Sequence, residues 1–139
     1  MREILFKAKR ICDGEWVEEY YLRDQYHIGG KDIIFYRKDS DRFTVYTDRI
    51  NIETLCQFTG LCDKNGKKIW ENDILMAHLD EFYPEDTTYE TVEWGVAGWV
   101  THESNSMDRE YLDEFDLKHF EVVGNIFDNK ELLQEESDE

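Results

Sequence analysis

The chain has 139 residues, of which 40% are hydrophobic and 14% aromatic, enough to close one core and too many for a wholly unfolded chain. It carries 33 acidic residues against 16 Lys and Arg residues, a formal net charge of −17. No apolar run approaches the roughly eighteen residues that span a bilayer, and the start lacks a secretory signal, so we expect a cytoplasmic protein without a membrane partner.

The first two predicted elements are β-hairpins. Residues 4–11 alternate between apolar and polar side chains, which predicts a strand with one buried face. Asp13-Gly14 supplies a tight turn, and residues 16–22 form the aromatic and β-branched return strand. The aromatic runs 33–37 and 43–47 flank an Asp-rich interval, which predicts a second hairpin.

The segment from residue 50 to residue 75 is the best organised part of the sequence. Residues 50–58 alternate and predict a strand or extended arm, with a helix as the alternative. Asn65-Gly66 is a strong turn signal, because both residues tolerate positive φ. Residues 69–70 are a predicted buried pair, and Asn72-Asp73 marks a second turn before a strand over residues 74–77.

The remaining sequence predicts a sheet with one or two short helices. Its elements follow in order: an exposed loop over 80–88, a third hairpin from 92–94 and 98–101, a short helix or 3₁₀ turn over 107–117, a final strand over 120–126, a helix over 130–134 capped by Asp128-Asn129, and an acidic tail over 135–139.

The charge is concentrated in the second half of the chain. Residues 1–75 hold 14 acids and 13 bases, whereas residues 76–139 hold 19 acids and 3 bases. Long-range repulsion therefore disfavours direct binding of the second half to nucleic acid or to an anionic membrane. A basic partner, a metal ion and a merely solvated acidic face remain the alternatives.

No motif in the sequence indicates catalysis or a cofactor. Asp63 to Lys67 begins like a calcium loop, but Lys67 and Lys68 take the next positions and no Glu stands at the twelfth. The four His show no paired metal spacing, and Cys56 and Cys62 are too far apart for a zinc knuckle. Three cysteines cannot pair fully, which favours a reducing interior. We therefore expect a non-enzymatic protein without metal or cofactor, although a Cys–His pair in space stays an alternative.

The tryptophans and the acids supply the candidate binding residues. Most of the four Trp are expected to fill the core, because rings mainly do so in small β domains. Trp99 follows a glycine, and we expect it to be partly exposed, where a ring can anchor a partner. The predicted binding residues are Trp99 together with Glu93, Asp80 and Glu81 from the acidic half.

Two separate motifs in the chain resemble those of the YopX family of phage and prophage proteins. The first runs from Thr59-Gly60-Leu61 through the Asp63-Lys64-Asn65-Gly66 turn to Ile74, and the second is Glu121-Val122-Val123-Gly124-Asn125-Ile126-Phe127. The opening hairpin also looks like the family's start. Asn72 stands where the family usually has Gly, and Lys130 where Pro is common. Because Asn tolerates left-handed backbone geometry, we expect the turn at Asn72 to form as it does with Gly.

The resemblance implies a mainly β fold: a small SH3-like barrel with additional N-terminal β-hairpins and one or two short helices. It implies one domain over residues 1–139, with hairpins over 1–49, the barrel region over 50–134 and the acidic tail over 135–139. It carries over no catalytic site and no established biochemical activity.

Three functions follow as hypotheses. The first is a phage-derived accessory protein that docks an unknown host or phage protein, possibly basic, as a non-enzymatic interaction module. The second is an acidic mimic of DNA that blocks a nucleic-acid-binding protein, since B-DNA carries a charge per about 1.7 Å of axis. The third is an enzyme with an unrecognised site. Assembly into homo-oligomers also stays open, because free sheet edges invite pairing between chains.

Overall fold

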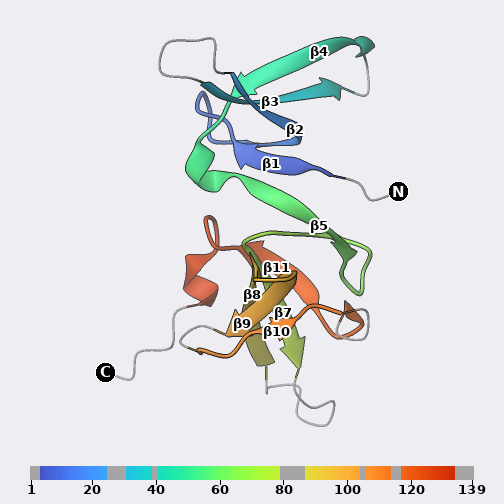
Figure 1. Cartoon of the computed structure of the whole chain (residues 1–139), viewed down its shortest axis with the longest axis vertical. Coiled ribbons are helices and arrows are strands. Elements are labelled where there is room, and N and C mark those ends of the chain that lie inside the picture. Colours follow the sequence, from blue (N-terminus) through green and yellow to red (C-terminus); the bar gives the residue numbers. More distant parts are fainter. Residues whose placement is uncertain are drawn as a thin grey trace. The chain divides into compact units, whose positions relative to one another are not determined.

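The computed structural model describes residues 4–24, 31–38, 41–78, 87–103, 106–113 and 117–133. These residues form a mainly β, antiparallel structure, as predicted from the sequence (Figure 1). The chain divides into two compact units, Met1–Phe58 and Thr59–Glu139. No helix in the described residues is long and apolar enough to cross a membrane.

The first unit contains both predicted N-terminal hairpins. Its strands pair antiparallel in the order β4-β3-β2-β1, and β1 also pairs with the start of β5. Gly14 has a φ of +74° in the first turn, a conformation that glycine adopts without a Cβ clash. The elements are β1 (Phe6–Lys9), β2 (Trp16–Asp24), β3 (Lys31–Lys38), β4 (Asp41–Arg49), the 3₁₀ turn η1 (Ile52–Thr54) and β5 (Cys56–Cys62).

The core of the first unit is small and aliphatic. Ala8, Val17, Ile34 and Ile50 are buried against one another. Ile4, which the alternation places on the same face of β1 as Ala8, is exposed. The strand begins only at Phe6, so Ile4 lies before the paired region.

The expected strand over residues 50–58 begins later than predicted. Asn51 caps η1, because its side-chain oxygen accepts from the backbone N–H of Glu53 at 3.1 Å. The Thr54 hydroxyl donates to the Asn51 carbonyl at 2.7 Å and accepts from the Lys9 N–H at 2.8 Å. These local bonds favour a turn, and β5 starts only at Cys56.

The division between the units lies within β5. The first residues of β5, Cys56 and Gln57, pair with β1, and the strand continues into the second unit. The sequence instead places the change from hairpins to barrel region after residue 49. The organisation of residues 1–139 as one domain stays a prediction.

The second unit contains a five-stranded antiparallel sheet in the order β10-β9-β8-β7-β11. Its core residues are Ile69, Leu75, Val92, Trp99, Phe120 and Val122. The third predicted hairpin is confirmed, since β8 and β9 pair up to Trp94 opposite Trp99. The elements are β6 (Lys68–Trp70), β7 (Asp73–His78), β8 (Thr87–Trp94), β9 (Trp99–Glu103), β10 (Glu110–Tyr111), β11 (Glu121–Asn125) and the 3₁₀ turn η2 (Lys130–Leu132).

The five-stranded sheet of the second unit is open and not a closed barrel, with β10 and β11 at its edges. The outer side of β11 is occupied by a turn: the Val122 N–H donates to the Asp63 carboxylate at 2.9 Å, and the Lys64 N–H donates to the Phe120 carbonyl at 3.2 Å. The other edge strand, β10, has only two residues. A covered edge and a very short edge both limit further strand pairing.

The Asp63 turn confirms the predicted turn at Asn65-Gly66. One Asp63 carboxylate oxygen accepts from the N–H groups of Asn65 and Lys67 at 2.8 and 2.9 Å, and Gly66 has a φ of +81°. The following turn has Asn72 at a φ of +71°, so asparagine does take the left-handed conformation there. The first family motif is therefore a pair of turns that positions β6, β7 and β11.

The helix expected over residues 107–117 is wrong for residues 107–113. Met107, Tyr111 and Leu112 have helix-like spacing, but Glu110 and Tyr111 pair with β9 instead. The Leu112 N–H donates to the Trp99 carbonyl at 3.0 Å, which continues this edge contact. Pairing with an existing strand satisfies backbone groups that a short isolated helix leaves open.

The predicted terminal helix is only the 3₁₀ turn η2. Asn129 occupies its N-cap position, but the side chain makes no cap hydrogen bond there. The Asn129 side-chain oxygen accepts instead from the Asn125 N–H at 3.1 Å. The tail over residues 135–139 lies outside the described residues.

Replacing Gly124 by alanine is expected to destabilise the second unit. An added Cβ would lie 2.3 Å from the Asn129 side-chain oxygen and 2.8 Å from its Cβ, so the segment around Asn129 would have to move. We expect a loss of about 1–3 kcal/mol in the free energy of unfolding, measured by urea denaturation. Gly98→Ala is the control, because its Cβ would meet the Tyr111 ring at an ordinary 3.6 Å. Equal stabilities for the two variants would contradict this packing.

Candidate functional site

Trp99, the predicted aromatic anchor, is a core residue. Its side chain is only 8% exposed and packs with the core of the second unit, so the expected partial exposure is wrong. Its register partner Trp94 is 55% exposed and meets the Trp99 ring edge to face, with centroids 4.9 Å apart. The aromatic surface that the sequence placed at Trp99 is therefore at Trp94.

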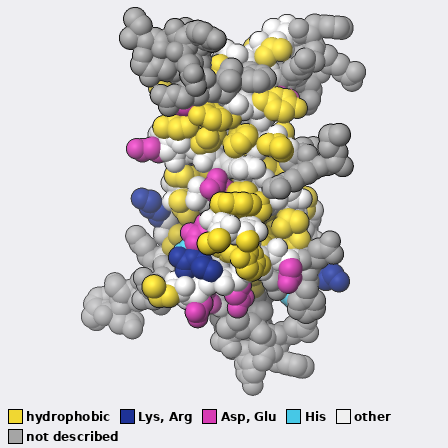
Figure 2. All heavy atoms as spheres, viewed as in Figure 1, with side chains coloured by type: hydrophobic (Ala, Val, Ile, Leu, Met, Phe, Trp, Pro, Cys, Tyr) yellow, Lys and Arg dark blue, Asp and Glu magenta, His cyan; other side chains and the backbone are white. Residues whose placement is uncertain are grey.

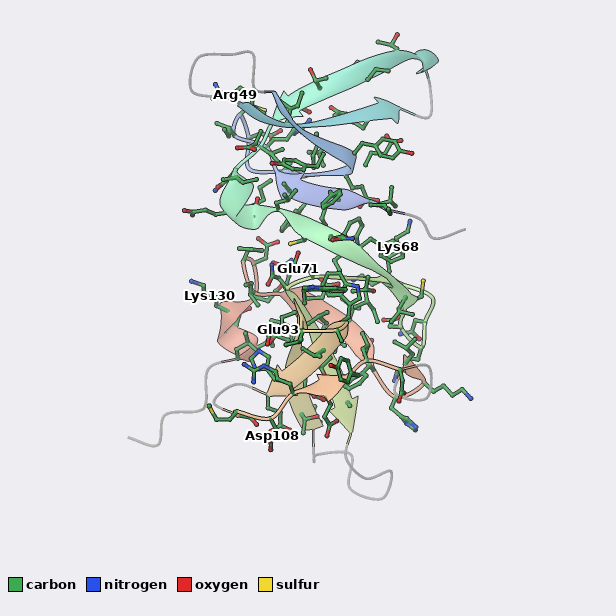
Figure 3. The ribbon with its side chains drawn as sticks, viewed as in Figure 1. Arg49, Lys68, Glu71, Glu93, Asp108 and Lys130 are labelled. Atoms are coloured by element: carbon green, nitrogen blue, oxygen red, sulfur yellow. The ribbon has the colours of Figure 1, made fainter. Side chains whose placement is uncertain are left out.

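Glu93 links β8 to β9 and to the segment before β10. Its carboxylate accepts from Arg109 Nε at 2.5 Å and lies 3.4 Å from His102 Nε2. Arg109 also donates to the carbonyl oxygens of Ser106 and Asp108, which fixes the segment before β10. Figure 3 labels Glu93 on β8 and Asp108 on this segment. The structure thus gives Glu93 a positioning role, while Asp80 and Glu81 lie outside the described residues.

Exposed apolar side chains surround the turn between β8 and β9, with Trp94 on the face of its register partner Trp99 and Tyr111 on the opposite face, that of its partner Val100. We call Trp94, Val96 and Tyr111 the turn patch. Val96 is fully exposed within the turn, and Tyr111 is 57% exposed with its ring 3.6 Å from the position of a Cβ on Gly98. The Gly95 N–H donates to the Gly98 carbonyl at 2.7 Å and closes the turn. On the face shown in Figure 2, hydrophobic side chains are exposed among charged ones.

A groove of about 290 Å³ lies near the opposite end of the same hairpin, and we call it the acidic groove. Thr101 donates to the Glu90 carboxylate at 3.1 Å within it. Neither Glu103, Asp108 nor Glu110 forms an ion pair within the part of the chain that the structure describes. Its described lining residues, which include no Lys or Arg, are Thr88, Glu90, Thr101, His102, Glu103, Ser106, Asp108 and Glu110.

A second groove of about 460 Å³ has a partly apolar lining that includes Val92, Ile126 and Leu133. His102 lies at its rim with both ring nitrogens engaged. Nε2 is 2.9 Å from the Thr91 hydroxyl, and Nδ1 is 3.1 Å from the Glu103 carbonyl. The contact with Thr91 joins register partners on β8 and β9, so the imidazole acts as a cross-strand contact.

The described Asp, Glu, His and Cys side chains do not gather into a metal site. Among the residues described, no group of three or more His, Cys, Asp or Glu side chains is placed to hold a metal ion. Cys12 and Cys62 are exposed, Cys56 is buried, and none of the three is in a disulfide. Burial alone raises the pKa of Asp63, but hydrogen bonds from the N–H groups of Val122, Lys67 and Asn65 outweigh it and lower that pKa. This perturbed group supports the fold and lines neither of the two grooves.

The two motifs are matched by a model of the YopX protein family over residues 5–134. The chain belongs to the YopX family. This confirms the family that the sequence motifs indicate. A similar solved structure is the crystal structure of protein EF1440 from Enterococcus faecalis, with a TM-score of 0.61 and 20% identity over 96% of this chain and 100% of that chain. No curated protein matches.

The sequence carries a signal for the turn patch but none for the acidic groove. The turn patch has a signal, since two tryptophans flank a glycine-bounded turn, but the sequence does not show which ring is buried. The acidic groove combines residues from β8, β9 and the segment 106–110. Those residues are single acids among many, so only the strand register brings them together.

Proposed function

We propose that this YopX protein is a non-enzymatic interaction module that docks a partner protein through the turn patch. The observation that carries the proposal is the exposure of Trp94, Val96 and Tyr111 around one closed turn. Aromatic side chains at the centre of interfaces contribute much of the binding energy, because they bury large areas with little loss of conformational entropy.

The patch is held in place before any partner binds. Trp94 packs on the buried Trp99 ring, and Tyr111 lies on β10, which pairs with β9. Arg109 and Glu93 tie the β10 segment to β8. A preorganised surface loses less entropy on association, which favours binding over a purely solvating role.

The proposal extends to the setting of the protein. We infer a cytoplasmic accessory protein of phage origin, on the basis of the family resemblance and of three cysteines that form no disulfide. We further propose that the second unit is a small SH3-like module whose sheet stays open at its edges. Its short antiparallel strands support this interpretation.

The test is affinity capture from lysate of the native host. The double variant Trp94→Ser and Val96→Ser should lose the protein that the wild type recovers, by about tenfold or more in yield. The matched control is Ile11→Ser, which removes an equally exposed apolar side chain from the first unit. Far-UV circular dichroism checks that both variants fold. Recovery of the same partner by the double variant would overturn docking through the turn patch.

A second candidate function is the acidic mimic of DNA. It is favoured by the 19 acids against 3 bases in residues 76–139 and by Glu103, Asp108 and Glu110 of the acidic groove, which form no ion pair within the described part of the chain. A mimic would bind a DNA-processing protein in competition with duplex DNA and would weaken steeply as salt rises. Binding that neither salt nor duplex DNA affects would exclude it.

A further inference from the structure

The groove of about 460 Å³ lies on the second face of the five-stranded sheet, and we call it the η2 groove. Thr91 and Glu93 alternate with the buried Val92 along β8, so they lie on the face opposite to that of this core residue. His102, the register partner of Thr91 on β9, lies on the same face as Thr91. The other wall of the groove comes from Ile126 and from the segment that contains η2.

Backbone hydrogen bonds fix the two walls of the η2 groove relative to each other. The Asn72 N–H donates to the Val92 carbonyl at 2.8 Å, and the Ile126 N–H donates to the Asn72 carbonyl at 3.0 Å. Further along this wall, the Leu133 N–H donates to the Lys130 carbonyl at 3.0 Å and closes η2. The groove is therefore formed before any ligand binds, which lowers the entropic cost of filling it.

The lining of the η2 groove combines apolar and polar side chains, as in small-molecule sites. Ile126 and Leu133 are half-buried and supply the apolar part of the wall that contains η2. Thr91 and His102 supply polar groups on the sheet. The volume of about 460 Å³ falls within the roughly 300–1,000 Å³ of such sites, so the groove suits a compact ligand with an apolar body.

The charges around the η2 groove favour an anion. Residues 76–139 hold only three bases, Arg109, Lys118 and Lys130. Lys130 lines the groove and forms no ion pair within the described part of the chain, whereas Arg109 pairs with the lining residue Glu93. Glu131 is exposed and is not among the described lining residues. A carboxylate in the groove would therefore gain a charge-assisted hydrogen bond from Lys130.

Lys130 decides the charge of the site although the whole chain carries a net charge of −17. Exposed charges more than about 8 Å away are largely screened at physiological salt. The side chain of Lys130 is a flexible four-carbon chain at an exposed position, so its ammonium can turn toward a ligand. Figure 3 labels Lys130 at η2 and Glu93 on β8, the two walls of the groove.

We propose that the η2 groove binds a small amphipathic carboxylate, with its apolar body on Ile126 and Leu133 and its carboxylate on Lys130. The described lining includes neither Trp94 nor Val96, so this site does not depend on docking through the turn patch.

Three probes of similar shape and different charge test the site: naphthoate, naphthalenemethanol and naphthylmethylammonium. Each is titrated into the isotope-labelled full-length protein at physiological salt, and the amide chemical shifts give both the position of the probe and its Kd. We expect shifts at Thr91, His102, Ile126 and Leu133. Naphthoate should bind about threefold to fivefold more tightly than the alcohol, and the ammonium should bind most weakly.

Lys130→Gln is the test variant, and Lys118→Gln is its matched control, because it removes the same charge from an exposed position outside the groove. The preference for naphthoate over the alcohol should disappear in Lys130→Gln and persist in Lys118→Gln. Leu133→Ser should weaken all three probes by about threefold or more, because it removes apolar contacts. A preference that survives in Lys130→Gln, an equal loss in Lys118→Gln, or shifts that avoid the groove with every probe would each overturn the proposal.

Discussion

Replacing Asp63 by alanine is expected to lower the free energy of unfolding by about 3–5 kcal/mol, among the largest effects of any single substitution in this chain. The carboxylate is buried and accepts backbone hydrogen bonds from Asn65, Lys67 and Val122. Alanine would leave these N–H groups without their acceptor. Urea denaturation monitored by tryptophan fluorescence measures the loss.

The charge of Asp63 adds a pH dependence to this effect. Its folded-state pKa is lowered, so its contribution is fully present above the unfolded pKa of about 3.9 and is lost as the pH falls through the lower folded value. The stability gap between the wild type and Asp63→Asn should therefore narrow in acid below that unfolded value. Asp108→Asn, at an exposed position, is the control and should change stability by less than about 0.5 kcal/mol. A gap that stays constant with pH would contradict the assigned role.

Replacing Leu75 by alanine is expected to lower the free energy of unfolding by about 2–5 kcal/mol. Leu75 is fully buried in the core of the second unit and lies opposite Glu90 on β8 and Val122 on β11. Truncation removes apolar contacts and leaves a cavity between elements that strand pairing holds in place. Thermal and urea denaturation both report the change.

The matched control for Leu75 is Val96→Ala. Val96 is fully exposed in the β8–β9 turn, so its truncation should change stability by less than about 0.5 kcal/mol. Near-ultraviolet circular dichroism should also change for Leu75→Ala, because the packing of Trp99 belongs to the same core. Equal stabilities of the two variants would show that the core is not where the structure places it.

The hairpins could be predicted because their signals are local. Alternation along β1 and β2 and the glycine at position 14 lie within a few residues of one another. The Asn65-Gly66 turn is equally local. What the sequence could not show is that Asp63 also binds Val122, 59 residues further along the chain. A partner at that distance leaves no periodic pattern.

The turn of the candidate surface could be predicted from local signals, but the buried ring could not, because its burial depends on residues far along the chain. Trp94 and Trp99 flank one turn and are register partners, so local patterning treats them alike. Trp99 is the buried ring, because it packs with Val122 on β11 and with Phe120 directly before that strand. Likewise, the helical spacing over 107–113 is overridden by pairing with β9, which then carries Asp108 and Glu110 to the groove.

The claim that the turn patch is the docking surface is tested most directly by one dissociation constant. The partner protein recovered from host lysate is labelled and titrated by fluorescence anisotropy with the wild type, with Trp94→Ser/Val96→Ser and with Ile11→Ser. Docking through the patch predicts that the double variant binds about tenfold more weakly or worse, while the control stays within about twofold of the wild type. Equal affinities for all three proteins would contradict it.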